Sequence, residues 1–319
     1  VNQWTTLSQA GAGTALDGRL GVYYAVLNNI LFINSRNTLT KQFDGSNVTA
    51  VTAPAGLLLT NYRDRLYVAG DGSSGTNGSS RRVSFSARGD GTSWTTASDY
   101  FDVEDQLGEA VSAMKVSGDT LGIFKTNSIY AYDEFQLKQR IKGVGAYNQK
   151  VVQEVNGVLY TFCPEGIFET NLSSAKQIGE PIREYWENFF PTYDSVSKRV
   201  CTNTFAWSYQ DSYYLFVNDI VSPTVTTDVV LEYDTKNNTW TVHTGGFVNL
   251  LHANTLRNMR YGDNPTSNYP VVVAGDSSGF VYRLNDTKYL DNGGTFRGSD
   301  LYVDLLIVGG VDSEGTPIA

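Results

Sequence analysis

The feature that most constrains this chain is a short unit that recurs along most of its length. In each unit a polar turn ending in Asp, Asn or Gly precedes an apolar or aromatic strand, and a further turn leads to a second such strand. Strands this short cannot bury their apolar faces alone, so neighbouring units must pack against one another. The strand pairs of this kind are residues 22–26 with 30–33, 66–68 with 82–85, 121–124 with 129–132, 158–162 with 167–169, 213–217 with 229–234, and 271–273 with 280–284.

The spacing of these units predicts an all-β fold of the propeller type. The turn residues Asp17, Asp64, Asp119, Asn156 and Asp211 lie 47, 55, 37 and 55 residues apart, and 60 more residues lead to the sixth unit. A period of about 40–60 residues built from short strands is typical of propeller blades. We therefore expect a β-propeller of about six blades, with five and seven as alternatives, and with long inter-strand loops at residues 71–80 and 218–227.

Helices have little place in this pattern. The composition, with 31 Gly, 20 Tyr and 15 Phe, favours strands and tight turns. One helix is expected over residues 180–190, where Ile182, Tyr185, Trp186 and Phe189 can share a face. Strands without alternating helices exclude a doubly wound α/β sheet.

The repeat fades toward the end of the chain, which predicts two unequal parts. We expect residues 1–290 to form the propeller and residues 291–319 to form a C-terminal extension or a ring-closing strand. Residues 301–308 have the composition of one more strand. This strand either completes the first blade or leads into a neighbouring element.

Charge excludes several classes of function. The formal net charge is −9, whereas general nucleic-acid binding needs clustered Lys and Arg for phosphate contacts. The small basic groups at residues 81–82, 138–142 and 198–199 are expected to be solvated turns. No apolar run approaches the roughly 18 residues of a membrane span, so no span is expected.

Cysteine and histidine are too rare for several kinds of site. Cys163 and Cys201 cannot supply a disulfide-rich scaffold or a Cys-based zinc module. We expect two buried thiols, with a disulfide between them as the alternative. His243 and His252 are too few for a multi-His metal site, and His243 is expected to be an ordinary strand residue.

The sequence contains no complete motif of an enzyme, whether a nucleophile elbow, a zinc-protease helix, a phosphate-binding loop or a dinucleotide-binding turn. Glu104 with Asp105, and Glu165 with Glu169, have the residue types of a glycosidase pair, but acids at a β-rich surface are usually solvated turn residues. The turns at 71–72 and 276–279 fall short of the ligand number of a calcium loop. We therefore expect a protein that is not an enzyme, with no catalytic, metal-binding or cofactor-binding residues and no cofactor.

Three further patterns have simple explanations. Arg88-Gly89-Asp90 spells a cell-adhesion tripeptide, which chance explains. Residues 86–94 are close to the turn motif of sialidase-type propellers, but Ser86 and Asp90 are too far apart and only one copy occurs. Asn-x-Ser/Thr triplets arise by chance in a chain rich in Asn and Thr; here they begin at Asn47, Asn77, Asn171, Asn237 and Asn285.

One stretch of the chain resembles a known family. The strand 65–68, the segment 82–90 with Trp94, and the strand 100–103 resemble a blade of the β-propeller proteins from the necks and tails of tailed bacteriophages. The resemblance continues through the segments Val111-Ser-Ala-Met114, Leu121-Gly-Ile-Phe-Lys125 and Asn127-Ser-Ile-Tyr130, and residues 156–168 and 230–240 are similar to later blades. It covers about residues 15–290, and its motifs are short.

This resemblance implies a structural virion protein of the nozzle or tail-hub type. Such a protein assembles in the host cytoplasm as a ring of identical copies, commonly a hexamer, below the portal and adaptor of the virion neck. Double-stranded DNA would then only pass through the channel during ejection, without being bound by the protein. A negatively charged wall suits that role, because it repels phosphate when its acids face the lumen.

Two other classes of function remain open. A carbohydrate-binding or glycan-processing propeller for host recognition would show exposed Trp and Tyr beside carboxylates on one face. An extracellular adhesion module has only the glycosylation triplets and the tripeptide 88–90 in its favour.

Overall fold

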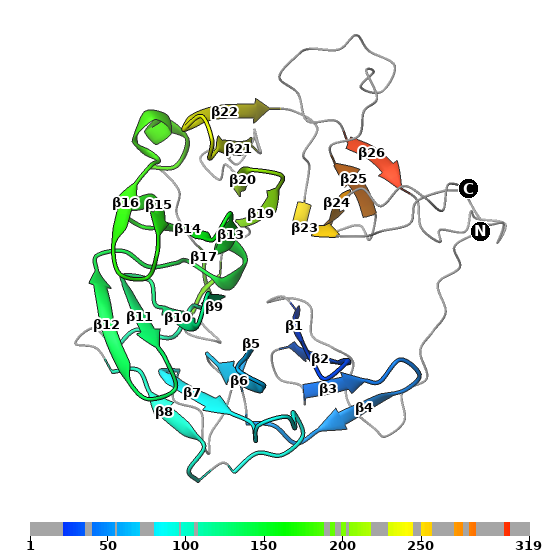
Figure 1. Ribbon diagram of the computed structural model, residues 1–319. Coiled ribbons are helices and arrows are strands. Elements are labelled where there is room, and N and C mark those ends of the chain that lie inside the picture. Colours follow the sequence, from blue (N-terminus) through cyan, green and yellow to red (C-terminus); the bar gives the residue numbers. More distant parts are fainter. Residues whose placement is uncertain are drawn as a thin grey trace, which may run out of the picture.

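Strands dominate the computed structural model, which describes residues 22–35, 40–54, 56–70, 80–95, 97–104, 108–187, 192–194, 199–201, 204–217, 229–244, 250–256, 271–276, 281–284 and 303–306. Within these residues the chain forms six four-stranded sheets and a separate two-stranded one. In each four-stranded sheet, strands that are consecutive in sequence pair with one another. The sheets follow one another around a common axis (Figure 1). The expected propeller is confirmed, with six blades in the described part.

The first three blades lie between residues 22 and 142. Blade 1 contains β1 (Val22–Leu27), β2 (Ile30–Ser35), β3 (Thr40–Phe43) and β4 (Val48–Val51). Blade 2 contains β5 (Leu58–Tyr62), β6 (Arg65–Ala69), β7 (Arg82–Phe85) and β8 (Tyr100–Asp102). Blade 3 contains β9 (Ala113–Ser117), β10 (Thr120–Phe124), β11 (Ser128–Tyr132) and β12 (Leu137–Lys142).

The other three blades follow a short 3-10 helix, η2 (Gln149–Val151). Blade 4 contains β13 (Gln153–Val155), β14 (Val158–Cys163), β15 (Gly166–Thr170) and β16 (Ala175–Gln177). The strands β17 (Thr192–Asp194) and β18 (Arg199–Cys201) then form the separate two-stranded sheet. Blade 5 contains β19 (Phe205–Tyr209), β20 (Ser212–Val217), β21 (Val229–Asp234) and β22 (Thr239–Thr244), and blade 6 contains β23 (Leu250–Leu256), β24 (Val271–Asp276), β25 (Val281–Leu284) and β26 (Val303–Leu306).

Each strand pair expected from the repeat is a pair of adjacent strands in one blade. The C-terminal strand β26 pairs with β25, and so is the fourth strand of blade 6 rather than a strand of blade 1. The division of the chain near residue 290 stays a prediction.

The helix expected over residues 180–190 is wrong in type and length. The structure has a 3-10 segment, η3 (Glu180–Tyr185), which is kinked at Ile182, where φ is −119° and ψ is 28°. Gly179 precedes it and offers no side-chain cap. Trp186 ends it by donating its indole N–H back to the Gly179 carbonyl at 2.8 Å. Residues 188–190 lie outside the described part.

A two-residue turn joins the first and second strands of blades 1 to 5. Its first residue has positive φ in every case, namely Asn28, Arg63, Gly118, Asn156 and Gln210. Positive φ at such turns matches the right-handed twist of the flanking strands, and Asn, Asp and Gly tolerate it best. Among the described turn residues that marked the repeat, Asp64 and Asn156 have positive φ themselves, whereas Asp119 and Asp211 each follow a residue with positive φ. The equivalent turn of blade 1 is 28–29; Asp17, the anchor used above, lies outside the described residues.

A second repeated device joins the third and fourth strands of four blades. The side-chain oxygen Oδ1 of an Asp or Asn accepts hydrogen bonds from the backbone N–H groups two and three residues later, at 2.8–3.1 Å. These bonds close the turn without help from the rest of the fold. The residues are Asp44 in blade 1, Asp133 in blade 3, Asn171 in blade 4 and Asp234 in blade 5.

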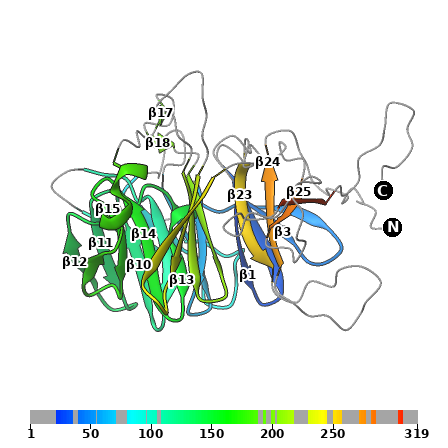
Figure 2. The ribbon, with the colours of Figure 1, turned by 90° about the horizontal axis from the view of Figure 1, so that it is seen from above.

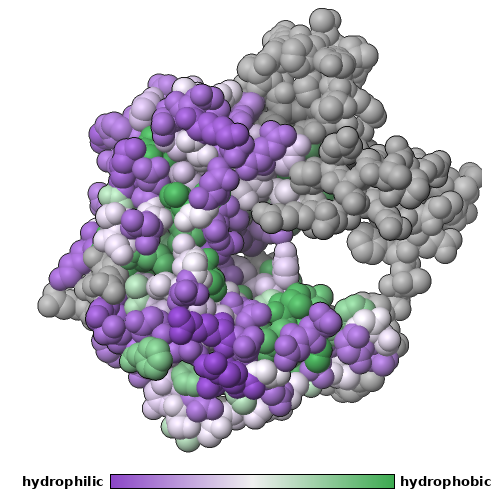
Figure 3. Space-filling view, in the orientation of Figure 1, coloured by the Kyte–Doolittle hydropathy of each residue, from purple (hydrophilic) through white to green (hydrophobic). Residues whose placement is uncertain are grey.

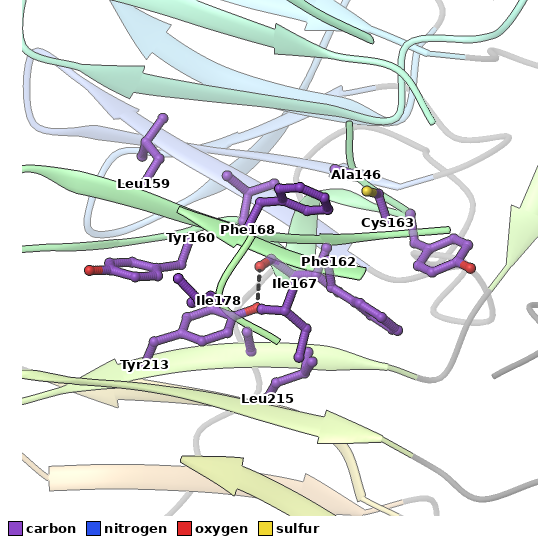
Figure 4. Packing of buried hydrophobic residues seen from close by; sticks show 14 of the residues in the cluster. Ala146, Leu159, Tyr160, Phe162, Cys163, Ile167, Phe168, Ile178, Tyr213 and Leu215 are labelled. Atoms are coloured by element: carbon purple, nitrogen blue, oxygen red, sulfur yellow. Dashed lines mark hydrogen bonds between the residues drawn. The ribbon is translucent and has the colours of Figure 1, made fainter. Parts of the chain in front are cut away.

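Apolar side chains fill the spaces between consecutive blades. One cluster joins blades 1 to 3, a second joins blades 3 to 5, and a third joins blades 5 and 6. In β20, Tyr213 and Leu215 point into the second cluster, whereas Tyr214 and Phe216 point into the third. Figure 4 shows the second cluster, where the rings of Tyr160 and Tyr213 stack with centroids 5.5 Å apart. Because neighbouring blades cover both of their faces, the central strands β6, β10, β14 and β20 are buried along almost their whole length.

Candidate functional site: two faces and an axis

The meander topology gives the ring two unlike faces. In an antiparallel four-stranded sheet, the connections between strands 1 and 2 and between strands 3 and 4 lie at one end of the strands. The connection between strands 2 and 3 lies at the other end, together with the link to the next blade. We call the side of the ring with the first set of connections the turn face, and the opposite side the loop face. In Figure 2, seen from the side, β17 and β18 project on the loop face. The expected long loops 71–80 and 218–227 connect second to third strands, and residues 71–79 and 218–228 lie outside the described part.

Acidic residues gather on the turn face. Figure 3 looks onto this face and shows a mostly hydrophilic surface, with an apolar patch over β1. The acidic residues of its described turns are Asp44, Asp64, Asp90, Asp99, Asp119, Asp133, Glu134, Asp211 and Asp234, and the basic ones are Arg63, Arg88 and Lys236. In the described connections of the loop face the two signs are closer to balance, with Glu104, Glu109, Glu165, Glu180, Glu184 and Glu187 against Arg81, Lys125, Lys150 and Arg183.

Side-chain contacts join the turns of neighbouring blades on this face. Glu134 lies 3.2 Å from the Arg63 guanidinium and 2.7 Å from that of Arg88, and so ties blade 2 to blade 3. Asn156 donates to Asp211 Oδ1 at 2.9 Å and ties blade 4 to blade 5. The turn face is therefore a connected surface rather than a set of separate hairpins.

The tripeptide 88–90 belongs to this surface. Besides the Arg88 ion pair, the Gly89 N–H donates to the Asp64 carbonyl at 2.6 Å, and the Gly89 carbonyl accepts from Asn28 at 2.8 Å. Asp90 accepts from the hydroxyl and the N–H of Thr92, and these two bonds hold its pKa below the usual value. The tripeptide is thus exposed, but its side chains and backbone are held by hydrogen bonds and an ion pair to neighbouring turns.

The segment 86–94, close to the sialidase turn motif, forms the compact corner between β7 and β8. Its Gly91 packs so closely on blade 1 that an added Cβ would lie 2.5 Å from the Phe32 ring and 2.6 Å from Leu66. Trp94 donates its indole N–H to the Gly91 carbonyl at 2.9 Å. The residue types of this segment therefore serve packing between blades 1 and 2.

The strand end Phe124-Lys125, part of the family resemblance, also has a structural role. The Lys125 side chain is fully buried and donates its ammonium to the Val103 carbonyl at 2.6 Å. Tyr130 donates its hydroxyl to the Glu104 carbonyl at 2.8 Å. Both bonds fix the connection from blade 2 to blade 3. A buried lysine has no signal in a single sequence, and sequence reasoning missed it.

Polar side chains at the ring axis satisfy the inner edges of the blades. Each innermost strand leaves backbone carbonyls unpaired on its free edge. The Val26 carbonyl of β1 accepts from Asn61 on β5 at 2.7 Å, and the Ala206 carbonyl of β19 accepts from Gln153 on β13 at 2.8 Å. An amide side chain of a neighbouring blade thus replaces the missing strand partner at each of these carbonyls.

The helix η2 lies across the loop-face end of the axis. Asn148 caps it, because Asn148 Oδ1 accepts from the N–H groups of Lys150 and Val151 at 2.8 and 3.2 Å. Side chains from this segment then reach blades on opposite sides of the ring. The bonds are Asn148 Nδ2 to the Thr204 carbonyl before β19, Gln149 Nε2 to Leu59 on β5 at 3.3 Å, and Lys150 Nζ to Leu251 on β23 at 3.5 Å.

The seam between blade 6 and blade 1 is unlike the other five. Val22, Tyr24 and Val26 alternate along β1 and are 39%, 55% and 51% exposed, on the face that other blades cover with a neighbour. Among the described residues of the two blades, a hydrogen bond from Asn254 Nδ2 to the Tyr24 hydroxyl crosses the seam at 2.7 Å. This hydrogen bond links the last blade to the first.

Two of the acids considered for a glycosidase pair, Glu104 and Glu169, each form an ion pair with a basic side chain. Glu104 pairs with Arg81 at 2.6 Å, and Glu169 pairs with Lys176 at 3.2 Å on neighbouring strands. Glu165 lies in the turn between β14 and β15. Asp105 and the turn 71–72 lie outside the described residues, as do residues 277–279. In the part that the structure describes, no three His, Cys, Asp or Glu residues are placed to hold a metal ion.

Two other expectations concern single residues. Cys163 is a free, buried thiol, so no disulfide joins it to Cys201. Burial raises the pKa of this thiol to about 11.

His243 is a strand residue of β22, but it also takes part in a buried polar cluster. Its Nε2 lies 2.8 Å from Glu232, which also accepts from the Tyr214 hydroxyl at 2.8 Å. The register that places these three side chains together was not visible in the sequence.

In the described part of the chain, the exposed aromatic side chains lie on three different elements and do not form one cluster. Tyr24 lies on β1, Tyr185 on η3 and Phe135 in the turn after β11. No helix there is long and apolar enough to cross a membrane.

Comparisons with known proteins address the fold. No protein-family model and no curated protein matches the chain. Among solved structures, the Neurospora crassa Pan2 WD40 domain aligns with a TM-score of 0.51 and 11% identity, covering 92% of this chain and 82% of that one. An ancestral GH74 enzyme aligns with a TM-score of 0.51 and 10% identity over 90% of this chain, which spans 38% of the enzyme. Identities this low speak for the fold alone, and with the six sheets they show that the chain is an all-β protein of the propeller fold.

Proposed function

We propose that this chain is a structural component of a bacteriophage neck or tail, where copies of it form a ring, with six copies favoured. The observation that carries the proposal is the polarity of the propeller. Acidic residues collect on the turn face, which is the surface expected to border a DNA channel. A wall of this sign repels phosphate and keeps the duplex from adhering to it.

The axis of one copy is not the conduit in this proposal. Side chains of η2 bridge blades 2, 5 and 6 across it. DNA would therefore pass between copies, along a lumen that their turn faces surround. The loop face would meet the portal, the adaptor and other tail proteins.

The family resemblance supports this proposal through residues whose roles are structural. The corner at Gly91 and Trp94 packs blade 2 on blade 1, and Lys125 and Tyr130 secure the link to blade 3. These are contacts of a scaffold, and in the described residues no group of three His, Cys, Asp or Glu side chains placed to hold a metal ion accompanies them.

Native mass spectrometry of the purified full chain tests the proposal, together with a glycan array. We expect a closed ring of identical copies and no glycan binding. A monomer at all concentrations that binds or cleaves a glycan would contradict the proposal and favour a propeller for host recognition.

A further inference from the structure

The innermost strand of blade 6 is irregular where it meets the axis. In β23 the register shifts after Leu250, which pairs with Asp276, so that His252 pairs with Gly275. Leu251 is the extra residue of this bulge, and its side chain is 48% exposed. Bulges re-aim side chains and are common beside functional sites. Here the bulge presents the Leu251 carbonyl to Lys150.

Lys150 is held at this position without a counter-ion among the residues that the structure describes. Its backbone N–H is fixed by the Asn148 cap, and its ammonium makes one long hydrogen bond, 3.5 Å, to Leu251. No carboxylate of the described residues pairs with it, and burial lowers its pKa. A partly buried cation without an anion beside it is unfavourable. Burial also lowers the pKa of Lys115, the other lysine near the axis, but there the negative charge of Glu154 partly opposes the effect of burial.

Close to Lys150, His252 is a second buried polar group that lacks a partner among the described residues. Its ring packs edge-on against Phe205, with centroids 5.8 Å apart, and its buried Nδ1 has no hydrogen-bond partner in the described part of the chain. Burial and the positive charge of Lys150 lower the pKa of His252 to about 4. A neutral imidazole thus lies beside an uncompensated ammonium, and an anion would stabilise the ammonium and the protonated imidazole alike.

We propose that Lys150 and His252 form a binding site for a small oxyanion at the loop-face end of the axis. The ammonium of Lys150 donates to the anion, and His252 takes up a proton from solvent as the anion binds. Phosphate and carboxylate share this chemistry. The source is therefore either a free phosphate ion or a carboxylate of a partner polypeptide.

Histidine NMR tests the site directly, because the chain has only two His. With inorganic phosphate, the His252 resonances should shift saturably, and the pKa of His252 should rise by about one unit or more. The His243 resonances serve as the internal control and should not move. Acetate and a peptide with a free C-terminal carboxylate, compared with its amidated form, separate the two sources.

Substitutions of Lys150 test whether the phosphate response of His252 depends on this lysine. In Lys150→Met the phosphate response of His252 should be lost, although its pKa without phosphate rises because the neighbouring charge is gone. Lys150→Arg should keep the response, as should Lys142→Met on the exposed edge of blade 3. A response that persists in Lys150→Met, or no saturable response to phosphate, acetate or the free-acid peptide, would overturn the proposal. Because the readout is a histidine of the single chain, failure here leaves ring assembly untouched.

Discussion

Individual polar side chains connect blades that the backbone leaves separate. Glu134 is the clearest case, since its carboxylate receives guanidinium groups from two segments of blade 2 while its side chain is only 15% exposed. Exposed ion pairs contribute little, but a carboxylate shared by two arginines in a partly covered site contributes more. Glu134 therefore links turn chemistry to the packing of whole blades.

Substitution of Glu134 by Gln tests this link. We expect Glu134→Gln to lower the free energy of unfolding by about 1 kcal/mol, measured by urea denaturation. Glu165→Gln, in an exposed turn of blade 4, is the matched control and should have little effect. Equal effects of the two substitutions would show that the shared carboxylate does not couple the blades.

Glu232 makes stability depend on pH. Burial raises its pKa, but hydrogen bonds from His243, Tyr214 and Ser212 outweigh burial, so its pKa lies below the usual value. A carboxyl with a lower pKa in the folded state adds stability above its unfolded pKa, and this is lost as pH falls through the folded pKa.

Glu232→Gln should therefore cost about 1–3 kcal/mol at neutral pH. The difference from the wild type should narrow below about pH 4.3, where the unfolded carboxyl takes up its proton. Urea denaturation across a pH series measures both quantities, with Glu169→Gln as the control. If the difference in the free energy of unfolding between the wild type and Glu232→Gln stays constant down to the most acidic condition, the proposed role of Glu232 is contradicted.

Among the elements, the short helix η2 makes contacts with several blades although it has only three residues. Its cap residue Asn148 satisfies two backbone N–H groups and also donates to blade 5. Tyr213 of β20 donates to the Val151 carbonyl at 3.0 Å. We expect Asn148→Ala to destabilise the protein by about 1–2 kcal/mol in thermal or urea unfolding.

Asn148→Asp separates the two roles of this residue. It keeps the oxygen that caps η2 but removes the amide that donates to the Thr204 carbonyl. An intermediate loss of stability is expected. If Asn148→Ala leaves stability unchanged, η2 does not hold the blades around the axis.

The elements also show what the sequence could predict. Strand pairs and the two-residue turns have local signals, because the central strands of the blades are rich in apolar residues and each described turn holds Asn, Asp or Gly at one or both positions. The 3-10 form of η3 was missed, since the spacing of Ile182, Tyr185 and Trp186 fits a helix, whereas the kink at Ile182 and the bond from Trp186 to Gly179 are tertiary features.

The proposed anion site at Lys150 and His252 could not be predicted from the sequence for a related reason. Lys150 and His252 are 102 positions apart and meet only because η2 crosses the axis and β23 carries a bulge. A bulge depends on the pairing of two strands, and no local pattern marks it. His252 was noted only as one of two histidines.

At the scale of the molecule, the seam between blades 6 and 1 should open before the others. Apolar clusters cover the five other seams, whereas this one has exposed side chains on β1 and the bond between Asn254 and Tyr24. Local opening follows the least buried interfaces. Amide hydrogens of β1 and β23 should therefore exchange faster than those of β10 and β14.

Tyr24→Phe should speed exchange in β1 and β23 further, because it removes the acceptor of the Asn254 amide. Tyr132→Phe in blade 3 is the control and should leave both strands unchanged. Hydrogen–deuterium exchange read by mass spectrometry resolves these segments. Uniform protection of all inner strands would show that the ring is closed as firmly at this seam as elsewhere.

The central claim is that copies of a six-bladed propeller surround a channel with their acidic turn faces. Cryo-electron microscopy of the purified full chain tests it most directly. The account predicts a closed ring of identical copies, each with η2 across its own axis and the turns at Asp44, Asp133 and Asp234 lining the shared lumen. A map of single, unassociated propellers, or of a ring whose lumen is lined by the loop face, would contradict it.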